Sequence, residues 1–225
     1  ADHADTCLCP LHGIEYLATE HEVDGVLVVG DLFDHARVSE RGVHQVYELL
    51  DRLPGTCVVM VGNHDVHDDR SLYHRFRPAV DATQVVLLDD HGGNDVRLFD
   101  GALHVWGRAM DEHSPAFKPL AGVTSRPGDD PWFIAMGHGH YVDEDEATHR
   151  SSLITPSDIR STSADYVALG HWHVTTDVSQ DDVTAWYSGA PSGQPGGNAL
   201  IVDLDVHHGV QVTQVEVPLS PSGCA

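Results

Sequence analysis

An α/β fold with a mixed pair of central sheets is the fold class that this sequence predicts. Two apolar runs, 25–30 and 56–61, have the length and continuity of strands buried on both faces. Each follows a segment with apolar residues at helical spacing, and this alternation favours parallel strands joined by crossover helices. After residue 84 the pattern changes to short apolar runs separated by Asp, Gly and Asn turns, which indicates further strands.

The elements of the first part follow from spacing and end signals. Apolar residues at helical spacing predict a helix over 11–22, and the residues before it are expected to end a strand. Ser39 is the predicted N-cap of a helix that runs to Leu53 and stops at Pro54-Gly55. The strand at 56–61 comes next. Because the chain starts with Ala1 and its first residues are expected to end a strand, we expect a truncated N-terminus that lacks the first strand.

The later elements are mainly strands. They are expected at 85–88, 96–99, 102–106, 133–136, 166–169, 183–187, 199–204 and 210–217. The polar segments 114–130 and 143–163 are expected to form surface loops with short helices. With no repeat and no clear linker, residues 1–225 are predicted to form a single domain.

Composition narrows the classes of function. The chain has 35 acidic and 12 basic residues, a net charge of −23 and a single lysine, Lys118. Such a surface repels polyanions, so contact with DNA would need a local basic patch and metal ions. A salt-adapted source or a GC-rich genome would both explain the excess of Asp. No apolar run reaches the roughly 18 residues of a membrane span.

The four cysteines, Cys7, Cys9, Cys57 and Cys224, lack the spacing of a zinc or dithiol redox motif. We expect them to be thiols in a reducing cytoplasm, which would place the protein in that compartment. Because the chain starts with Ala1, a processed signal peptide stays an alternative.

Metal-ligand residue types follow four of the apolar strands. The blocks are Gly30-Asp31-Leu32-Phe33-Asp34, Gly62-Asn63-His64-Asp65, Gly137-His138 and Gly170-His171-Trp172-His173. Because ligand sites of α/β sheets form at the carboxyl ends of strands, the blocks are expected to converge on one crevice. Carboxylate, amide and imidazole ligands suit Mn, Fe or Zn better than Ca or Mg.

The number of ligands exceeds what one four-coordinate ion needs. An aspartate that bridges two ions, with a bridging hydroxide as nucleophile, would support in-line displacement at a phosphoryl group. Taken singly, a Gly-Asp after a strand is usually a turn, and 18 histidines make chance His-x-His pairs common. The ordered occurrence of all the blocks after apolar strands favours the metal site.

These blocks resemble those of the calcineurin-like metallophosphoesterases, which implies a four-layer α/β/β/α sandwich with two mixed central sheets. Within that superfamily, three segments resemble the nuclease subunit of SbcCD-type DNA repair exonucleases: 30–34, 165–173 and the turn at 187–191. Relatives of that group continue into a C-terminal capping region and helices that dock an ATPase coiled coil, and this chain is expected to lack that part.

The resemblance also implies a role for each residue. Asp31 would bridge two divalent ions, manganese in the first place, with iron or zinc as alternatives. His64 would act at the leaving-group oxygen as general acid or phosphate-stabilising donor, oriented by Asp65. Asp34 would steer the ligand imidazoles. The remaining implied metal ligands are Asn63, His138 and His171 for one ion, and Asp2 and His173 for the other.

The first block departs from the family pattern. The family has Asp-x-His, whereas this chain has Asp2-His3-Ala4-Asp5. Asp2 is the expected ligand, and His3 stands one position early, which in a strand places it on the opposite face. A missing residue, an altered loop that lets His3 reach the metal, and a weaker ligand shell are the three explanations.

Further residues bear on the substrate. Arg70, Arg75 and Arg77 are candidates to bind phosphate oxygens, the alternative being a solvated helix with salt-bridging arginines. Trp172 is expected to wall the pocket rather than stack on a base. His35 and His140 are interpreted as histidines on the substrate or solvent side.

Three functions follow from these observations. The first is a dinuclear phosphodiesterase, most like a manganese-dependent DNA exonuclease or endonuclease, with an SMC-type ATPase as partner. The second is a phosphoesterase of nucleotides or other small molecules, which the acidic composition favours. The third, a non-catalytic interaction subunit, is supported by the irregular first block alone.

Overall fold

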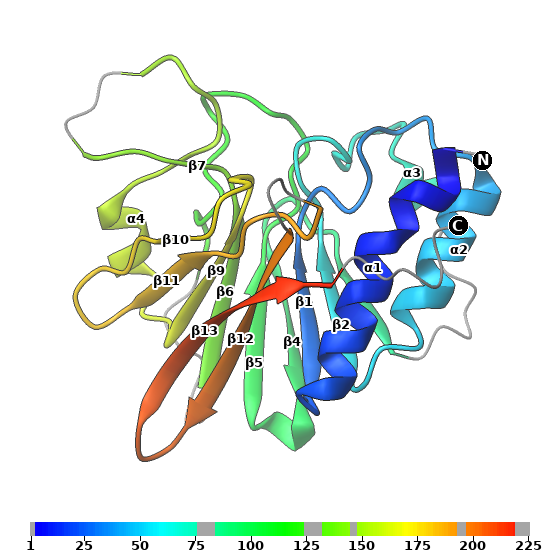
Figure 1. Ribbon diagram of the computed structural model, residues 1–225. Coiled ribbons are helices and arrows are strands. Elements are labelled where there is room, and N and C mark those ends of the chain that lie inside the picture. Colours follow the sequence, from blue (N-terminus) through cyan, green and yellow to red (C-terminus); the bar gives the residue numbers. More distant parts are fainter. Residues whose placement is uncertain (1–2, 76–83, 124–131, 145–147, 193–196, 219–225) are drawn as a thin grey trace.

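Two β-sheets lie face to face in the computed structural model of the protein, which describes residues 3–75, 84–123, 132–144, 148–192 and 197–218 (Figure 1). The smaller sheet has the order β1 (Gly25–Val29), β2 (Thr56–Met60) and β3 (Val85–Leu88). Its three strands are parallel, with Val28 opposite Val59 and Val59 opposite Leu87. The expected crossover of the first two strands is therefore confirmed.

The larger sheet is mixed and has the order β10-β11-β9-β6-β5-β4. Its parallel centre is formed by β11 (Thr184–Tyr187), β9 (Tyr166–Gly170), β6 (Trp132–His138) and β5 (Leu103–Gly107). The edge strands β10 (Thr176–Asp177) and β4 (Asn94–Leu98) are antiparallel to their neighbours. Separate pairs are formed by β7 (His140–Tyr141) with β8 (Leu153–Ile154), and by β12 (Gly197–Asp205) with β13 (Gly209–Val217).

Helices cover the outer faces of the two sheets. On the smaller sheet lie α1 (His3–Glu20) and α2 (Glu40–Leu50), whereas α4 (Pro156–Ser161) lies on the larger sheet (Figure 1). The predicted N-cap of α2 is confirmed, because the Ser39 hydroxyl accepts a hydrogen bond from the Gly42 amide at 3.1 Å. The remaining helical segments are α3 (Leu72–Arg75) and a short 3-10 turn, Phe99–Gly101.

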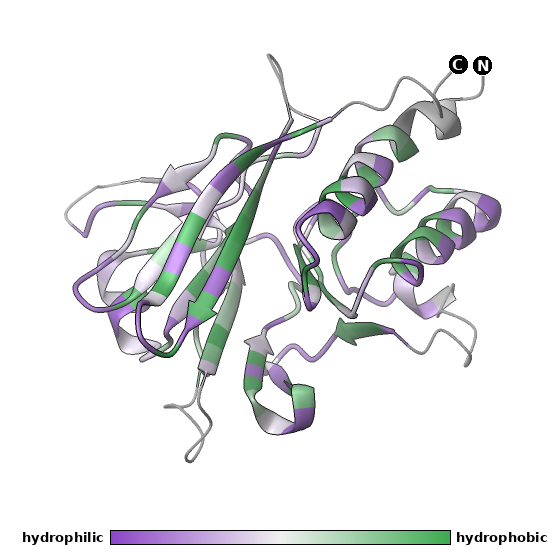
Figure 2. Ribbon diagram, turned by 60° about the horizontal axis from the view of Figure 1, so that its bottom comes forward, coloured by the Kyte–Doolittle hydropathy of each residue, from purple (hydrophilic) through white to green (hydrophobic). Residues whose placement is uncertain are grey.

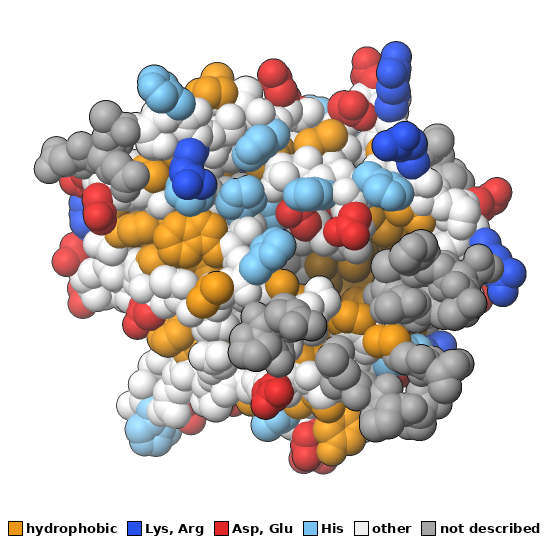
Figure 3. Space-filling view, turned by 45° about the horizontal axis from the view of Figure 1, so that its top comes forward, with side chains coloured by type: hydrophobic (Ala, Val, Ile, Leu, Met, Phe, Trp, Pro, Cys, Tyr) orange, Lys and Arg blue, Asp and Glu red, His pale blue; other side chains and the backbone are white. Residues whose placement is uncertain are grey.

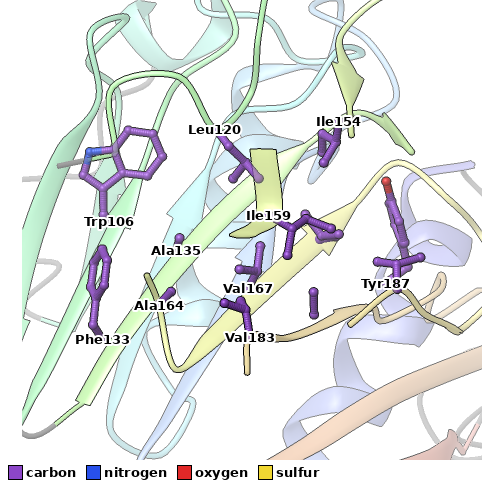
Figure 4. Close-up of a cluster of buried hydrophobic side chains, with 13 residues drawn as sticks. Trp106, Leu120, Phe133, Ala135, Ile154, Ile159, Ala164, Val167, Val183 and Tyr187 are labelled. Atoms are coloured by element: carbon purple, nitrogen blue, oxygen red, sulfur yellow. The ribbon is translucent and has the colours of Figure 1, made fainter. Parts of the chain in front are cut away.

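Side chains alternate between the two faces of each strand, and this alternation divides them between two core layers. In β2, Cys57 and Val59 face the helices, whereas Val58 and Met60 pack between the sheets. In β6 and β9, alternate side chains likewise divide between the inter-sheet cluster and the outer cluster under α4 that Figure 4 shows. The chain is therefore an α/β/β/α sandwich, as the resemblance to the metallophosphoesterases implies.

The β12–β13 hairpin adds to the inter-sheet core. Hydrophilic and hydrophobic residues alternate along its strands (Figure 2), and Val202, Leu204, Val210 and Val212 pack against the inter-sheet cluster. No helix in the described ranges is long and apolar enough to cross a membrane.

Two expectations about the N-terminal region are wrong. The residues before Leu11 form the first turns of α1 instead of a strand end, because Leu8 continues the apolar stripe of Leu11 and Ile14 against the core. Cys9 is disulfide-bonded, so the expectation of four thiols is wrong there. Cys57 is a buried thiol, as expected.

Candidate active site

The four predicted blocks meet where β1, β2, β6 and β9 end. Gly30 and Gly170 allow this close approach, because a Cβ at Gly30 would collide with the His138 ring and one at Gly170 with the Val29 carbonyl. Asp31 and His171 follow these glycines with φ angles of 55° and 99°. Such angles are unfavourable for residues with a side chain, and strain of this kind is typical of functional sites.

Four polar side chains come together at this point. The Asp31 Oδ2 atom lies 3.1 Å from His138 Nε2, and Asn63 Oδ1 lies 3.0 Å from the same nitrogen. The Asn63 oxygen is also 2.9 Å from His171 Nδ1. One ligand atom each from Asp31, His138 and His171 lie within 4.8 Å of one another, which is the spacing of a metal site. The structure thus brings together four of the seven predicted ligands.

The hydrogen bonds of His138 test whether this site fits a cation. Its Nδ1 lies 2.7 Å from the Val29 carbonyl oxygen, which can only accept, so Nδ1 carries the hydrogen. In the neutral ring, Nε2 then presents a lone pair toward Asp31 Oδ2 and Asn63 Oδ1, which are acceptors as well. Three acceptors that face one another need a cation or an extra proton between them. The residues therefore fit a divalent metal ion, and Val29 fixes the imidazole tautomer that binds it.

The electrostatics of the two histidines differ. Burial opposes the charged form of His138, but the Asp31 carboxylate and the Val29 carbonyl outweigh burial and raise its pKa. The His138 imidazole correspondingly helps to lower the pKa of Asp31 against the opposing effect of burial. Burial and the charge of His138 lower the pKa of His171 to about 4, so His171 stays neutral and able to bind a metal near pH 7.

Asp65 connects the loops that carry the ligands. Its Oδ1 accepts hydrogen bonds from the amides of Gly62 at 2.8 Å and Asp31 at 3.3 Å. Its Oδ2 accepts from the Phe33 amide at 3.3 Å and the Tyr73 hydroxyl at 2.7 Å. The carboxyl is 1% exposed, and burial raises its pKa although the Tyr73 hydroxyl and the Gly62 amide oppose the shift.

His64 is held by a different group from the one predicted. Its Nδ1 lies 3.1 Å from the carbonyl oxygen of Asp34, and its backbone amide donates to Asp31 Oδ1 at 2.8 Å. The described hydrogen bonds of Asp65 go to Tyr73 and to three backbone amides instead. Asp34 therefore orients the His64 ring through its carbonyl group, whereas Asp65 holds the backbone that surrounds it.

None of the other predicted ligands or arginines whose side chains the structure describes joins the cluster. His173 is exposed and lies outside the group of possible ligands. Asp2 and Arg77 fall outside the described residues, and for His3 and Arg75 the helical backbone alone is described. Arg70 and His35 are exposed, with no role in the cluster. Trp172 packs on Tyr187, with ring centroids 4.7 Å apart, and thus walls the site as expected.

Two residues near the cluster escaped the sequence analysis. The His113 ring lies 5.9 Å from the His171 ring and hydrogen-bonds to Ser152 through Nδ1 at 3.1 Å. Arg150 lines an open cleft of about 570 Å³ together with His140, His171 and other residues. Both come from loops without a local motif, so no pattern in the sequence marks them. Figure 3 shows histidine side chains gathered around acidic ones on this face.

Comparisons with known proteins show the family and the fold of the chain. A family model described as calcineurin-like phosphoesterase matches residues 11–175. The fold is similar to that of TT1561 of Thermus thermophilus, with a TM-score of 0.63, 11% identity and 93% of each chain covered. It is also similar to a novel archaeal phosphodiesterase, with a TM-score of 0.51, 18% identity and coverage of 93% of this chain and 92% of that one. No functionally curated protein sequence matches this chain.

Proposed function

The chain belongs to the calcineurin-like phosphoesterase family, and we propose that it hydrolyses phosphodiester bonds at the cluster of Asp31, Asn63, His138 and His171. The family makes it a metal-dependent phosphoric ester hydrolase. One observation carries the choice of site: the His138 Nε2 lone pair faces two oxygen acceptors, an arrangement that a divalent cation stabilises. The similarity in fold to an archaeal phosphodiesterase supports diesters as the substrate class.

We further propose that two divalent ions act here, with manganese as the first candidate and iron or zinc as alternatives. Asp31 would bridge them, and His173 with Asp2 would help to hold the second ion. When bound, such ions supply Lewis acidity at the phosphoryl group and lower the pKa of water. His3 stays a candidate ligand of the same ion.

The residues of this chain would perform the other parts of the reaction. Because the Asp34 carbonyl accepts from His64 Nδ1, Nε2 is the atom through which the protonated imidazolium would donate a proton to the leaving oxygen. His64 is exposed, so it can reach a substrate that approaches from solvent. Asp65 would act indirectly, by holding the backbone of the loops that carry Asp31 and Asn63 in place.

The proposal leaves two alternative substrate classes, DNA and small phosphoesters. The resemblance of segments 30–34 and 165–173 to nuclease blocks supports DNA as the substrate. With DNA as the substrate, we propose an SMC-type ATPase as the partner and the cytoplasm as the compartment. The net charge of −23 and the single lysine support a small phosphoester instead, because they disfavour binding of a long polyanion. Arg70, Arg75 and Arg77 would bind phosphate oxygens in either case.

The test is a comparison of three substrates with added Mn²⁺, at low and at molar salt. We expect hydrolysis of bis-p-nitrophenyl phosphate that exceeds that of p-nitrophenyl phosphate. Cleavage of linear double-stranded DNA in the same assay would support the nuclease. His138→Gln should abolish the activity, and His44→Gln, an exposed histidine on α2, is the matched control. A folded protein that cleaves none of the three substrates would refute the proposal.

A further inference from the structure

We propose that the cleft beside His171 binds a second phosphate group of the substrate and that Arg150 selects for it. This inference rests on the proposed function, because it places the scissile phosphate at the metal-binding cluster. The ligand chemistry is a phosphodiester that carries another phosphate close by, either in a nucleotide or in the next unit of a strand.

The composition of the cleft supports an anionic ligand. Its described lining includes His140, Arg150, Trp172 and the two histidines of the Gly-His-x-His block, His171 and His173. Arg150 is the guanidinium in this lining. An anion bound there would lie next to His171, which belongs to the proposed metal site. The cleft is open to solvent, and its volume of about 570 Å³ leaves room for a phosphate group beside Arg150.

Arg150 differs from the arginines with structural ion pairs, and unlike Arg41, which has no described ion pair either, it lines the cleft beside His171. Arg52 pairs with Glu15 at 3.2 Å and Arg160 with Glu144 at 2.6 Å. Within the described part of the chain, no carboxylate forms an ion pair with the Arg150 guanidinium, although the protein carries 35 acidic residues. A guanidinium can bind two phosphate oxygens at once, which gives it both strength and orientation as a phosphate ligand.

Contacts within the protein hold the wall of the cleft in place. The Trp172 ring stacks on Tyr187 at an angle of 17°, and Tyr187 is fully buried, with its hydroxyl donating to the Gly139 carbonyl at 2.9 Å. The Trp172 indole N–H donates to His140 Nδ1 at 2.9 Å, which places the ring hydrogen of neutral His140 on Nε2. A rigid wall reduces the entropy that binding costs.

The experiment uses two chromogenic diesters that differ by one phosphate: thymidine 5′-(p-nitrophenyl phosphate) and its 3′-phosphorylated derivative. We expect the protein to prefer the 3′-phosphorylated ester by about tenfold or more in kcat/KM, the size of a charge-assisted contact. Arg150→Gln should remove this preference through KM, with kcat unchanged, because the contact is made equally in the ground state and the transition state. Arg150→Lys should retain part of it.

Arg41→Gln is the matched control, since Arg41 is an exposed arginine on α2 and its substitution makes the same change in charge. A preference that survives in Arg150→Gln, or one that Arg41→Gln removes equally, would overturn the inference. A single-stranded oligonucleotide distinguishes the sources of the second phosphate. A KM effect of Arg150→Gln on the oligonucleotide assigns the cleft to a strand, and an effect on the nucleotide ester alone assigns it to a small substrate.

A binding measurement separates failure of the inference from failure of the proposed function. Thymidine 3′,5′-bisphosphate should bind more tightly than thymidine 5′-phosphate, and Arg150→Gln should make the two affinities equal. If neither ester is hydrolysed but this difference is found, the proposed reaction is wrong and the phosphate site stands. Equal affinities in the unsubstituted protein would refute the phosphate site.

Discussion

Replacing Asp65 with asparagine should destabilise the fold and loosen the metal site at the same time. Each oxygen of the Asp65 carboxylate accepts two hydrogen bonds, one set from Gly62 and Asp31 and the other from Phe33 and Tyr73. An amide keeps one oxygen and turns the other acceptor into a donor. Whichever oxygen is lost, donors then face a donor in a site that is 1% exposed.

The geometry sets the size of the loss. If the amide nitrogen replaces Oδ2, the Tyr73 hydroxyl can turn and accept, so the Phe33 amide alone loses its partner. A buried donor without a partner costs about 1–3 kcal/mol, and loss of the charge weakens the remaining bonds. We therefore expect Asp65→Asn to lower the free energy of unfolding by about 2 kcal/mol. Tyr73→Phe removes one bond to a charged group and should cost about 1.5 kcal/mol.

Urea unfolding followed by circular dichroism measures both values, and a double-mutant cycle measures their coupling. Because Asp65 and Tyr73 share one bond, the double substitution should cost less than the sum of the single ones. Asp65→Asn should also weaken Mn²⁺ binding in calorimetry, since the loops of Asp31 and Asn63 lose their connection. An unchanged urea midpoint, with an altered pH profile of turnover, would refute this reasoning and favour the predicted role of Asp65 in orienting His64.

The remaining predictions concern the metal and proton chemistry. His64→Ala should keep its metal content but lose turnover by about 10²–10⁴-fold, measured by metal analysis and steady-state kinetics; unchanged turnover excludes an acid role. Asp31→Asn should lose both ions together, and retention of two ions in the purified variant would exclude the bridge. In the metal-free protein, the raised pKa of His138 contributes stability that is present below pH 6.5 and is lost as pH rises through the folded-state pKa. Metal binding displaces that proton, so the increase in Tm on adding Mn²⁺ should grow between about pH 6 and pH 8; a constant increase would contradict this competition.

The sequence predicts the cluster because its signal is local. Asp31, Asn63, His138 and His171 each lie at or just after the end of an apolar strand, and the carboxyl ends of parallel strands meet at one edge. The parallel pair β1–β2 brings together the strand ends that lead to Asp31 and Asn63, and the parallel pair β6–β9 does the same for His138 and His171. The stacking of one sheet on the other is a tertiary property that no local pattern contains, and here the resemblance to a family supplied it.

The parts that the sequence missed depend on contacts between distant segments. Arg150 and His113 reach the site from loops whose composition resembles that of any polar surface. Asp65 follows His64 directly, which suggests that the two side chains cooperate, yet the fold buries Asp65 toward Tyr73 and leaves His64 in solvent. Adjacent residues of an irregular segment often point in different directions, and packing decides which one is buried.

Gly30 and Gly170, the two glycines of the site, link the geometry of the metal cluster to the packing of the two sheets. Gly30 follows β1 of the smaller sheet directly, and Gly170 ends β9 of the larger one. A side chain at either position would meet the His138 ring or the Val29 carbonyl, the two groups that join the sheets by a 2.7 Å hydrogen bond. The same bond fixes the tautomer of His138 and therefore its capacity to bind a metal. The glycines thus do more than allow a turn, since a change in sheet separation would alter the ligand geometry directly.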